Sequence, residues 1–405
     1  MNDHSLAFQS FWEPQPEITD HADAESARKW LHQLLSTVIK REASDLLISI
    51  NAPPTLKMAG RMTPLGEAPL SQAQVKALVN VALPDSQRER LQREQEANFT
   101  LSVPRLGRFR VSAFQQRGQP AMVLRRISFD IPTLESLSLP ASLGDLVTIK
   151  RGLVFVVGGT GSGKSSTLAA LIQRRNTTIG GHILCIEDPI EYIHAHQNAI
   201  INQREVGVDT ESFEIALKNT LRQAPDVIMI GEVRSQETMQ HALSFAETGH
   251  LCLATLHANN ANQALDRIIN FFPVERHPQV WLDLSLNLRA IVAQQLLPAT
   301  NGGRQVAVEV LRHSPLIGDL IRKGKVPEIK ELIGRSNDLG MQTFDQSLYR
   351  LFREGLISED VALVHADSAN ELRLMIQFGH ETGEAANQVK ENLRHLRLQE
   401  DGEGF

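Results

Sequence analysis

The chain has 405 residues, which is enough for two or three domains with a sizeable core. Its 41 lysines and arginines against 47 acidic residues give a net charge of −6, which argues against a nucleic acid as the main partner. No apolar run approaches the ~20 residues that cross a bilayer, and the polar, acidic start lacks a secretory layout. Cys185 and Cys252 lie in strand-like apolar runs, so we expect buried thiols and a cytoplasmic protein without a disulfide framework.

The first third of the chain predicts a compact α+β domain at residues 28–129, preceded by a disordered polar tail over 1–27. Helical spacing of apolar residues predicts helices over 25–43, 71–83 and 87–94. Short apolar or alternating stretches predict strands over 46–50, 56–58, 61–63, 98–103, 107–115 and 121–127.

The segment 130–140 is bounded by prolines and is predicted to be a linker. After it, apolar strands alternate with helices, which predicts a mostly parallel sheet in an α/β domain at 141–378. Strands are expected over 153–157, 182–186, 227–230 and 252–255. The chain beyond Gln263 is predicted to be mainly helical, with helices over 283–297, 341–354 and 358–365 and a polar tail over 379–405.

Residues 158–165 read Gly-Gly-Thr-Gly-Ser-Gly-Lys-Ser and follow an apolar strand, as in a phosphate-binding loop. The glycines let successive backbone N–H groups point at one anion, and the helix that begins near Lys164 adds its positive end. Lys164 is expected to reach the β- and γ-phosphates, and Ser165 to hold Mg²⁺. The sequence therefore predicts a nucleoside-triphosphate site made by Gly158, Gly159, Thr160, Gly161, Ser162, Gly163, Lys164, Ser165 and Ser166.

Carboxylates follow two of the later predicted strands. Glu187, Asp188 and Glu191 follow one of them, and Glu232 follows another. Such acids at strand ends beside a phosphate loop can hold Mg²⁺, partly through water, and polarise the attacking water. The alternatives are a solvated acidic loop and, for Glu232, a cap for the next turn. Gly231 stands where phosphate-loop ATPases usually carry an aspartate.

His250 and His257 flank the predicted strand 252–255, and we expect both rings near the carboxyl edge of the sheet. A neutral imidazole there can hydrogen-bond a phosphate. Arg222 and Arg234 are the candidates for a cationic contact within the same chain.

Arginines also lie within the predicted antiparallel strands of the first domain. For most of them a solvated strand face is the expected role. The alternative is that one of them stabilises phosphoryl charge in a neighbouring subunit, as in other nucleoside triphosphatases. The candidates for that role are Arg108, Arg110, Arg125 and Arg126.

The chain resembles the secretion-ATPase superfamily, and within it the PilT/PilU branch of type IV pilus retraction ATPases. The resemblance lies in the phosphate loop and in the segments 186–191, 202–206, 231–234, 246–250 and 255–257. Similarity to that branch extends over residues 28–378. It implies a PAS-like N-terminal domain, a RecA-like ATPase domain with C-terminal helices, and a hexameric ring with ATP and Mg²⁺ between the two domains. It also implies a base-like Glu191, a Mg²⁺-associated Glu232, histidine contacts from His250 and His257, and arginines acting in trans.

Segments 206–230, 258–272 and 283–297 are more similar to the PilU-like members of the branch. PilT-like members carry an Ala-Ile-Arg-Asn-Leu-Ile-Arg-Glu motif that retraction needs. Here the segment 315–323 takes its place, and Gly318 replaces the first arginine of the motif. The resemblance thus implies an accessory motor at the inner membrane that works with a PilT-type ATPase on the platform protein of the pilus machine.

Three other functions compete with this one. A type II secretion or pilus assembly ATPase usually carries a tetracysteine zinc insertion, which a chain with two cysteines cannot build. A nucleic-acid translocase is disfavoured by the acidic charge and by the lack of a basic, aromatic-interleaved patch. A non-catalytic partner of a motor is disfavoured by the intact Lys164, Glu191 and Glu232.

Overall fold

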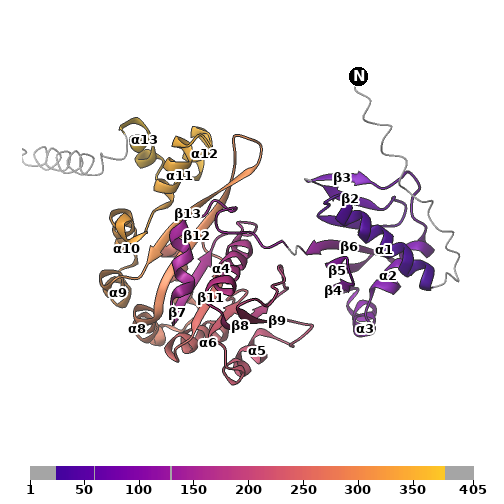
Figure 1. Cartoon of the computed structure of the whole chain (residues 1–405), viewed down its shortest axis with the longest axis horizontal. Coiled ribbons are helices and arrows are strands. Elements are labelled where there is room, and N and C mark those ends of the chain that lie inside the picture. The colour runs from indigo at the N-terminus through magenta and orange to yellow at the C-terminus, as the bar shows by residue number, and fades with distance from the viewer. Residues whose placement is uncertain (1–23, 59, 128–129, 379–405) are drawn as a thin grey trace, which may run out of the picture. The chain divides into compact units, whose positions relative to one another are not determined.

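The computed structural model describes residues 24–378 except Ala59, Ser128 and Phe129. The described residues form two compact units: one comprises the residues up to Asp130 together with Glu191–Ile193 and Gly207–Asp209, and the other comprises the remaining residues from Ile131 onward (Figure 1). Most of the predicted tail 1–27 and the whole of the tail 379–405 lie outside the described residues. Residues 24–27 belong to the first helix and not to a tail.

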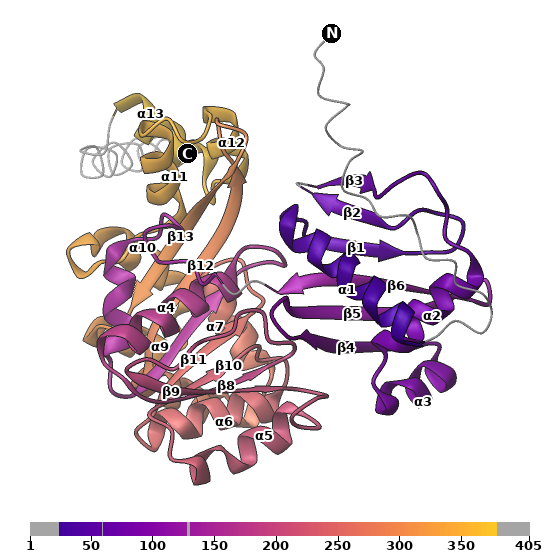
Figure 2. The ribbon, with the colours of Figure 1, turned by 45° about the vertical axis from the view of Figure 1, so that its right-hand side comes forward.

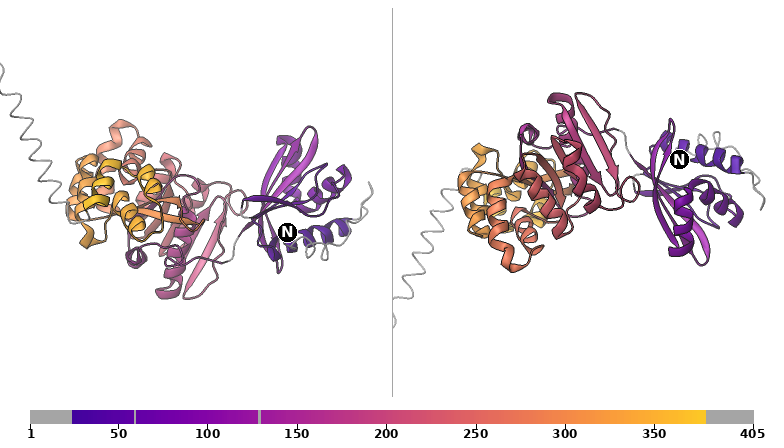
Figure 3. Two further views of the ribbon diagram at one scale, coloured as in Figure 1. Left: turned by 90° about the horizontal axis from the view of Figure 1, so that it is seen from above. Right: turned by 90° about the horizontal axis from the view of Figure 1, so that it is seen from below.

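The first unit is an antiparallel sheet with the strand order β3-β2-β1-β6-β5-β4. Helices α1 and α2 lie on one face of this sheet (Figures 2 and 3). The elements are α1 (Ala24–Lys40), β1 (Asp45–Ile48), β2 (Thr55–Met58), β3 (Arg61–Pro64), α2 (Gln72–Ala82), α3 (Asp85–Glu94), β4 (Glu96–Val103), β5 (Gly107–Gln116) and β6 (Gln119–Ile127).

Amphipathic patterning explains why these helices form and which side they bury. Trp30, Leu34 and Val38 recur at helical spacing and pack with Phe109 of the sheet in one core. Ser71 begins α2 with a capping box, in which its hydroxyl accepts from the N–H of Gln74 and the Gln74 side chain accepts from the N–H of Ser71. All predicted elements of this unit are present, with ends that differ by a few residues.

The second unit is a sheet with the strand order β13-β12-β7-β11-β10-β8-β9. All neighbours run parallel except β12 and β13, so the predicted parallel sheet gains an antiparallel edge. The strands are β7 (Gly152–Val157), β8 (Gly181–Glu187), β9 (Ala199–Glu205), β10 (Val227–Ile230), β11 (Leu251–Leu256), β12 (Leu288–Pro298) and β13 (Arg304–Arg312).

Helices cover both faces of this sheet, and the strands are accordingly apolar on both sides. Val154 and Val156 of β7 pack in the core beneath α4, whereas Leu153 and Phe155 face the core beneath α5 to α11. The helices are α4 (Lys164–Thr178), α5 (Phe213–Thr220), α6 (Gln236–Glu247), α7 (Ala261–Asn270), α8 (His277–Asn287), α9 (Pro315–Arg322), α10 (Val326–Arg335), α11 (Phe344–Arg353), α12 (Glu359–His365) and α13 (Ala369–Phe378), with short 3-10 helices η2 (Ala141–Thr148), η3 (Leu221–Gln223), η4 (Val274–Arg276) and η5 (Asn337–Leu339).

The predicted helix over 283–297 is wrong. Helix α8 ends at Asn287, and the following residues form β12 between β7 and β13. A strand buried on both faces carries a continuous apolar run, which periodicity alone does not distinguish from a buried helix. For the same reason, the sequence analysis did not predict strand β13, so the chain beyond Gln263 is less helical than predicted.

The segment 130–140, predicted as a linker, contributes core residues to the second unit. Leu134 and Leu139 are buried there beside Leu143 of η2.

Cys185 and Cys252 are buried as predicted, and burial raises the pKa of the Cys252 thiol to about 12.

The edge strand β13 is covered by the segment before α11. Val310 exchanges two backbone hydrogen bonds with Gln342, of 2.8 and 3.1 Å. The Gln342 amide also donates to the carbonyl of Val308 at 2.9 Å, and the Ser347 hydroxyl accepts from the N–H of Val308. Gln342 and Ser347 therefore supply hydrogen-bond partners to part of the sheet edge, at Val308 and Val310.

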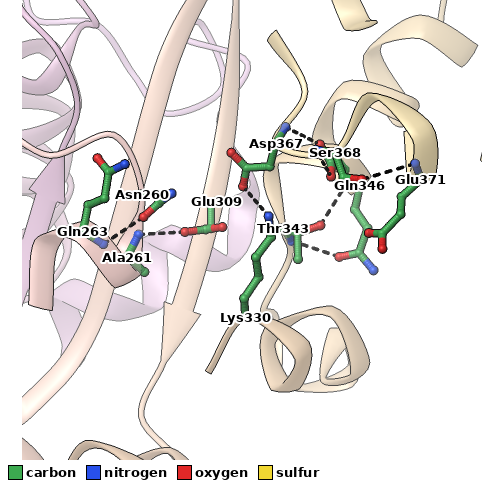
Figure 4. Close-up of polar contacts among 11 residues, drawn as sticks. Asn260, Ala261, Gln263, Glu309, Lys330, Thr343, Gln346, Asp367, Ser368 and Glu371 are labelled. Carbon is green, nitrogen blue, oxygen red and sulfur yellow. Dashed lines mark hydrogen bonds and ion pairs between the residues drawn. The ribbon is translucent and has the colours of Figure 1, made fainter. Parts of the chain in front are cut away.

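A group of acids lies beneath these helices (Figure 4). Glu309 of β13 is buried and accepts the N–H of Ala261, at the start of α7, at 2.8 Å. Asp345 accepts the N–H groups of Asp367 and Ser368, at 2.9 and 3.2 Å. Lys330 of α10 pairs with Asp367 at 2.8 Å.

Within residues 24–378, no helix is both long and apolar enough to cross a membrane.

Candidate nucleotide site

The carboxyl ends of the parallel strands meet at one edge of the second sheet. The register aligns Val157 with Leu256, and Ile230 with both Ala254 and Ile186. The segments that leave these strands are therefore neighbours at the edge where open α/β sheets bind ligands.

The predicted phosphate loop follows β7 and ends where α4 begins at Lys164. The surroundings of Gly158 leave no room for a side chain, because a Cβ there would lie 2.4 Å from the Ser162 hydroxyl and 2.6 Å from the carbonyl of Gln294. The Lys164 ammonium donates to the carbonyls of Gly158 and Gly159, at 2.9 and 2.8 Å. The structure thus brings the predicted loop residues together around one lysine.

Glu232 is the centre of a compact charged group just after β10. Its Oε1 lies 3.0 Å from Nε2 of His257, and its Oε2 lies 2.6 Å from Nη2 of Arg234. The Glu232 side chain is only 16% exposed, so both contacts are partly shielded from water. The sequence predicted Glu232, His257 and Arg234 near the loop, but it did not predict that they contact one another.

The charges of this group follow from their neighbours. The hydrogen bond to Glu232 raises the pKa of Arg234, so the guanidinium stays charged. Burial, followed by the positive charge of Lys164, lowers the pKa of His257 against the opposing effect of Glu232. We therefore assign a neutral imidazole at neutral pH, whose Nε2–H donates to Glu232.

The unusual Gly231 has a steric reason. A Cβ at this position would lie 3.1 Å from Cα of Glu187 and 3.2 Å from the carbonyl of Ile186. The ends of β10 and β8 approach too closely for an aspartate to enter unchanged. The Thr255 hydroxyl donates to the Gly231 carbonyl and fixes the peptide between these strands.

The acids after β8 differ from one another. Glu187 is buried, and its Oε1 accepts from the amide of Gln203 on β9 at 2.9 Å. Asp188 is exposed, with its Oδ2 3.7 Å from Nη1 of Arg234. Glu191 is exposed and makes no hydrogen bond or ion pair within the described part of the chain. Its side chain is therefore available, while that of Glu187 is held.

The prediction that both histidines lie at the carboxyl edge is wrong for His250. This residue precedes β11, and its carbonyl accepts the N–H of Gly152 at the amino end of β7. A strand of six residues separates it from His257, about 20 Å along the chain. Its Nδ1 lies 3.1 Å from the Thr248 hydroxyl instead. Arg222 also precedes its strand, β10, and so lies at the same far edge.

The four candidate arginines of the first unit, Arg108, Arg110, Arg125 and Arg126, fall on both faces of its sheet. Arg110 and Arg125 are direct cross-strand partners and share one face, as does Arg108 two residues along β5. Arg126 lies opposite the fully buried Phe109 and so begins on the face covered by helices. Arg125 pairs with Asp45 at 2.7 Å.

A functional candidate that the sequence did not predict is Gln294 of β12. Its side chain is buried, and it bonds to both the phosphate loop and the first turn of α4. The only signal in the sequence is a pair of glutamines, 294 and 295, inside an otherwise apolar run.

The fold and the site define a phosphate-loop ATPase with an N-terminal sheet domain. The sequence matches the family described as Type II/IV secretion system protein over residues 20–323, and the chain belongs to this family.

Among its relatives is the type IV pilus ATPase PilU of Pseudomonas aeruginosa, 60% identical over 351 residues, which are 86% of this chain and 92% of that protein. The type IV pilus retraction ATPase PilT of the same organism is 41% identical over 330 residues, covering 82% of this chain and 96% of that protein. A crystal structure of the pilus retraction motor PilT with bound ADP superposes with a TM-score of 0.80 at 39% identity, and covers 85% of this chain and 98% of that one.

These findings confirm the predicted superfamily, the mixed α/β fold class and the ATPase activity. The N-terminal sheet domain, the ATPase domain and the C-terminal helices all have their counterparts in PilT.

Proposed function

We propose that this chain is a ring-forming ATPase that hydrolyses ATP to drive type IV pilus retraction, and thus twitching motility, as an accessory motor beside a PilT-type ATPase. The assembled phosphate loop, with Glu232 and His257 at the same sheet edge, carries the proposal. The similarity to PilU and PilT supplies the process.

The loop and Lys164 bind the phosphates in this proposal. The ammonium already lies against the loop carbonyls, so a short swing of its flexible stem brings it to an anion cradled by the loop. The dipole of α4 adds positive potential at the same place.

Mg²⁺ is implied by this chemistry, and the residues present fit it. Mg²⁺ keeps several waters and takes few protein ligands beside the phosphates. This agrees with the finding that residues 24–378 contain no cluster of three acidic, histidine or cysteine ligands. Ser165 and, through water, Glu187, Asp188 and Glu232 are the residues that would hold it, because each carboxylate keeps lone pairs for a water beside the hydrogen bonds that it already accepts. The ion would neutralise charge on the transferring phosphate.

Glu191 is the proposed base. An exposed carboxylate without a protein partner is free to accept a proton from a water that attacks the γ-phosphate. Glu232 has both oxygens occupied by His257 and Arg234, which suits it to hold those groups in place rather than to take up a proton.

Arg110 is the best-placed arginine for a contact in trans with a neighbouring subunit of a hexamer. It stands directly opposite the like-charged Arg125, and only Arg125 is paired with an acid, Asp45. Arg110 has no charged partner within the described residues and lies on the face without α1 and α2. Such a cation gains from a phosphate supplied by another subunit.

Gly318 supports the accessory role. It is buried in α9 against α8, where a Cβ would lie 2.9 Å from Nε2 of His313 and 3.3 Å from the carbonyl of Ser285. An arginine at this position requires His313 to move from its contact with Ser285. The local surface thus differs from that of a chain with the arginine, consistent with a motor that engages the platform protein at the inner membrane, on its cytoplasmic side, only with a PilT-type partner.

Two measurements test the function. Purified chain, alone and mixed with a PilT-type ATPase, should release phosphate from ATP. Cells that express only this protein, without PilT, should not retract pili. Sustained retraction in those cells contradicts the accessory role. Absence of ATP turnover by the chain alone, with no turnover in the mixture above the rate of the PilT-type ATPase, contradicts the motor itself.

The trans contact has its own test. Lys164→Ala and Arg110→Ala should each be inactive, and mixing the two variants should restore part of the turnover, because some sites then combine both intact groups. Arg90→Ala on α3 is the matched surface control and should behave as wild type. If Arg110→Ala retains wild-type turnover, the assignment is wrong.

A further inference from the structure

Gln294 is a buried amide beside the phosphate loop. Strand β12 pairs with β7 so that Ala293 stands opposite Val157, which places Gln294 next to the first loop residue, Gly158. The residue is 1% exposed. A polar group this deeply buried in an apolar strand is retained only where its bonds are satisfied.

Both ends of the amide are used. Nε2 donates to the carbonyl of Ser162 at 2.6 Å, and Oε1 accepts from the Thr167 hydroxyl at 2.9 Å. Ser162 belongs to the loop, and Thr167 belongs to the first turn of α4. A side chain that donates and accepts at once can make this link, and neither a carboxylate nor an apolar chain of the same size can.

The bond to Ser162 fixes the direction of a backbone donor. In a planar trans peptide, the C=O and the N–H point to opposite sides. Because the Ser162 carbonyl points to Gln294, the N–H of Gly163 points away from Gln294. The N–H of Gly163 has no partner among the described residues, so it is available for an anion.

We infer that Gln294 is a positioning residue for ATP, which holds the Ser162–Gly163 peptide in the orientation that presents the Gly163 N–H to the phosphates. This inference rests on the ATP site at Gly158–Ser165. It adds a determinant from β12, more than 120 residues beyond the loop, to a site otherwise made by the loop itself.

The test compares two neighbouring glutamines in the full-length chain. Gln294→Met keeps the volume and loses both bonds, whereas Gln295→Met alters the adjacent residue, whose Oε1 lies 3.3 Å from Nδ1 of His365. Gln294→Met should raise the ATP dissociation constant and KM by about tenfold, with a smaller change in kcat. Gln295→Met should leave both unchanged. Unfolding temperatures without nucleotide report on the fold, and the added stabilisation by ATP should shrink only for Gln294→Met.

Gln294→Glu keeps the inference testable if Gln294→Met does not fold. Its carboxylate cannot donate to Ser162, but its protonated acid can, so its ATP affinity relative to wild type should recover as the pH is lowered from 8 to 6. A folded Gln294→Met with wild-type KM, or a Gln294→Glu variant whose relative affinity does not change with pH, overturns the inference. If wild-type protein itself fails to bind ATP, the proposed function fails instead.

Discussion

Two groups of acids in the second unit have opposite surroundings. At the carboxyl edge, Glu232 contacts a guanidinium and an imidazole within 3.0 Å, and a lysine lies nearby. Beneath the C-terminal helices, Glu309 is buried and contacts a backbone N–H, with Asp345 and Asp367 as neighbours. Burial, together with those acids, raises the pKa of Glu309 to about 7.

The difference separates function from architecture. Glu232 contacts Arg234 and His257 at an edge where a ligand can enter, whereas Glu309 joins β13 to α7 and Asp345 joins α11 to the segment before α13 by accepting backbone N–H groups. Burial also raises the pKa of Asp345, although two N–H groups oppose that change. Substitutions at the first group should therefore change catalysis, and substitutions at the second should change stability.

The largest effect is expected at Lys164, which shares the edge with Glu232. Lys164→Ala should lower ATP turnover by about 10³-fold or more, because a methyl group cannot supply charge to the phosphoryl group. Phosphate release measures this, and circular dichroism should show an intact fold. Turnover within tenfold of wild type in a folded variant contradicts the site.

Glu232→Gln should lower kcat by about 10²-fold and leave the unfolding temperature within a few degrees of wild type. The amide keeps the shape but loses the charge that holds Arg234 and His257. A variant that loses stability but keeps its kcat would place Glu232 with the architectural acids.

Asp345→Ala should lower the free energy of unfolding by about 2–3 kcal/mol, because it leaves the N–H groups of Asp367 and Ser368 without their acceptor. Chemical denaturation measures the loss, and kcat per folded molecule should remain that of wild type. A lowered kcat at unchanged stability is the contrary result.

The smallest effect is a gain. Glu309 is protonated in the folded and the unfolded chain below pH 4.5, and the folded chain keeps the proton up to about pH 7. Its contribution to the free energy of unfolding is therefore present at low pH and is lost as the pH rises through 7. Glu309→Gln still accepts from Ala261 and should be more stable than wild type at pH 8 by about 2 kcal/mol, with no gain at pH 4. Denaturation curves at the two pH values decide this, and an equal difference at both contradicts it.

The sequence predicted what local chemistry dictates. The loop requires glycines and a lysine at fixed spacing, and Ser71 precedes its helix with a capping box, so both were found. His250 was misplaced because its distance from the loop depends on strand length and direction, which motif order does not contain.

Gln294 was missed for a related reason. The strand that carries it is buried on both faces, and its apolar run was read as a helix. The contacts of Gln294 with Ser162 and Thr167 span 132 and 127 residues of sequence. Interactions between such distant segments depend on sheet order, which a single sequence does not state.

The covered edge at β13 also bears on solubility. An exposed edge strand offers unpaired N–H and C=O groups to other chains and invites sheet-to-sheet aggregation. Gln342 and Ser347 occupy those groups on Val308 and Val310, so the segment before α11 and α11 itself protect this part of the edge from pairing with another strand. A chain shortened before Gln342 would present that edge to its own copies.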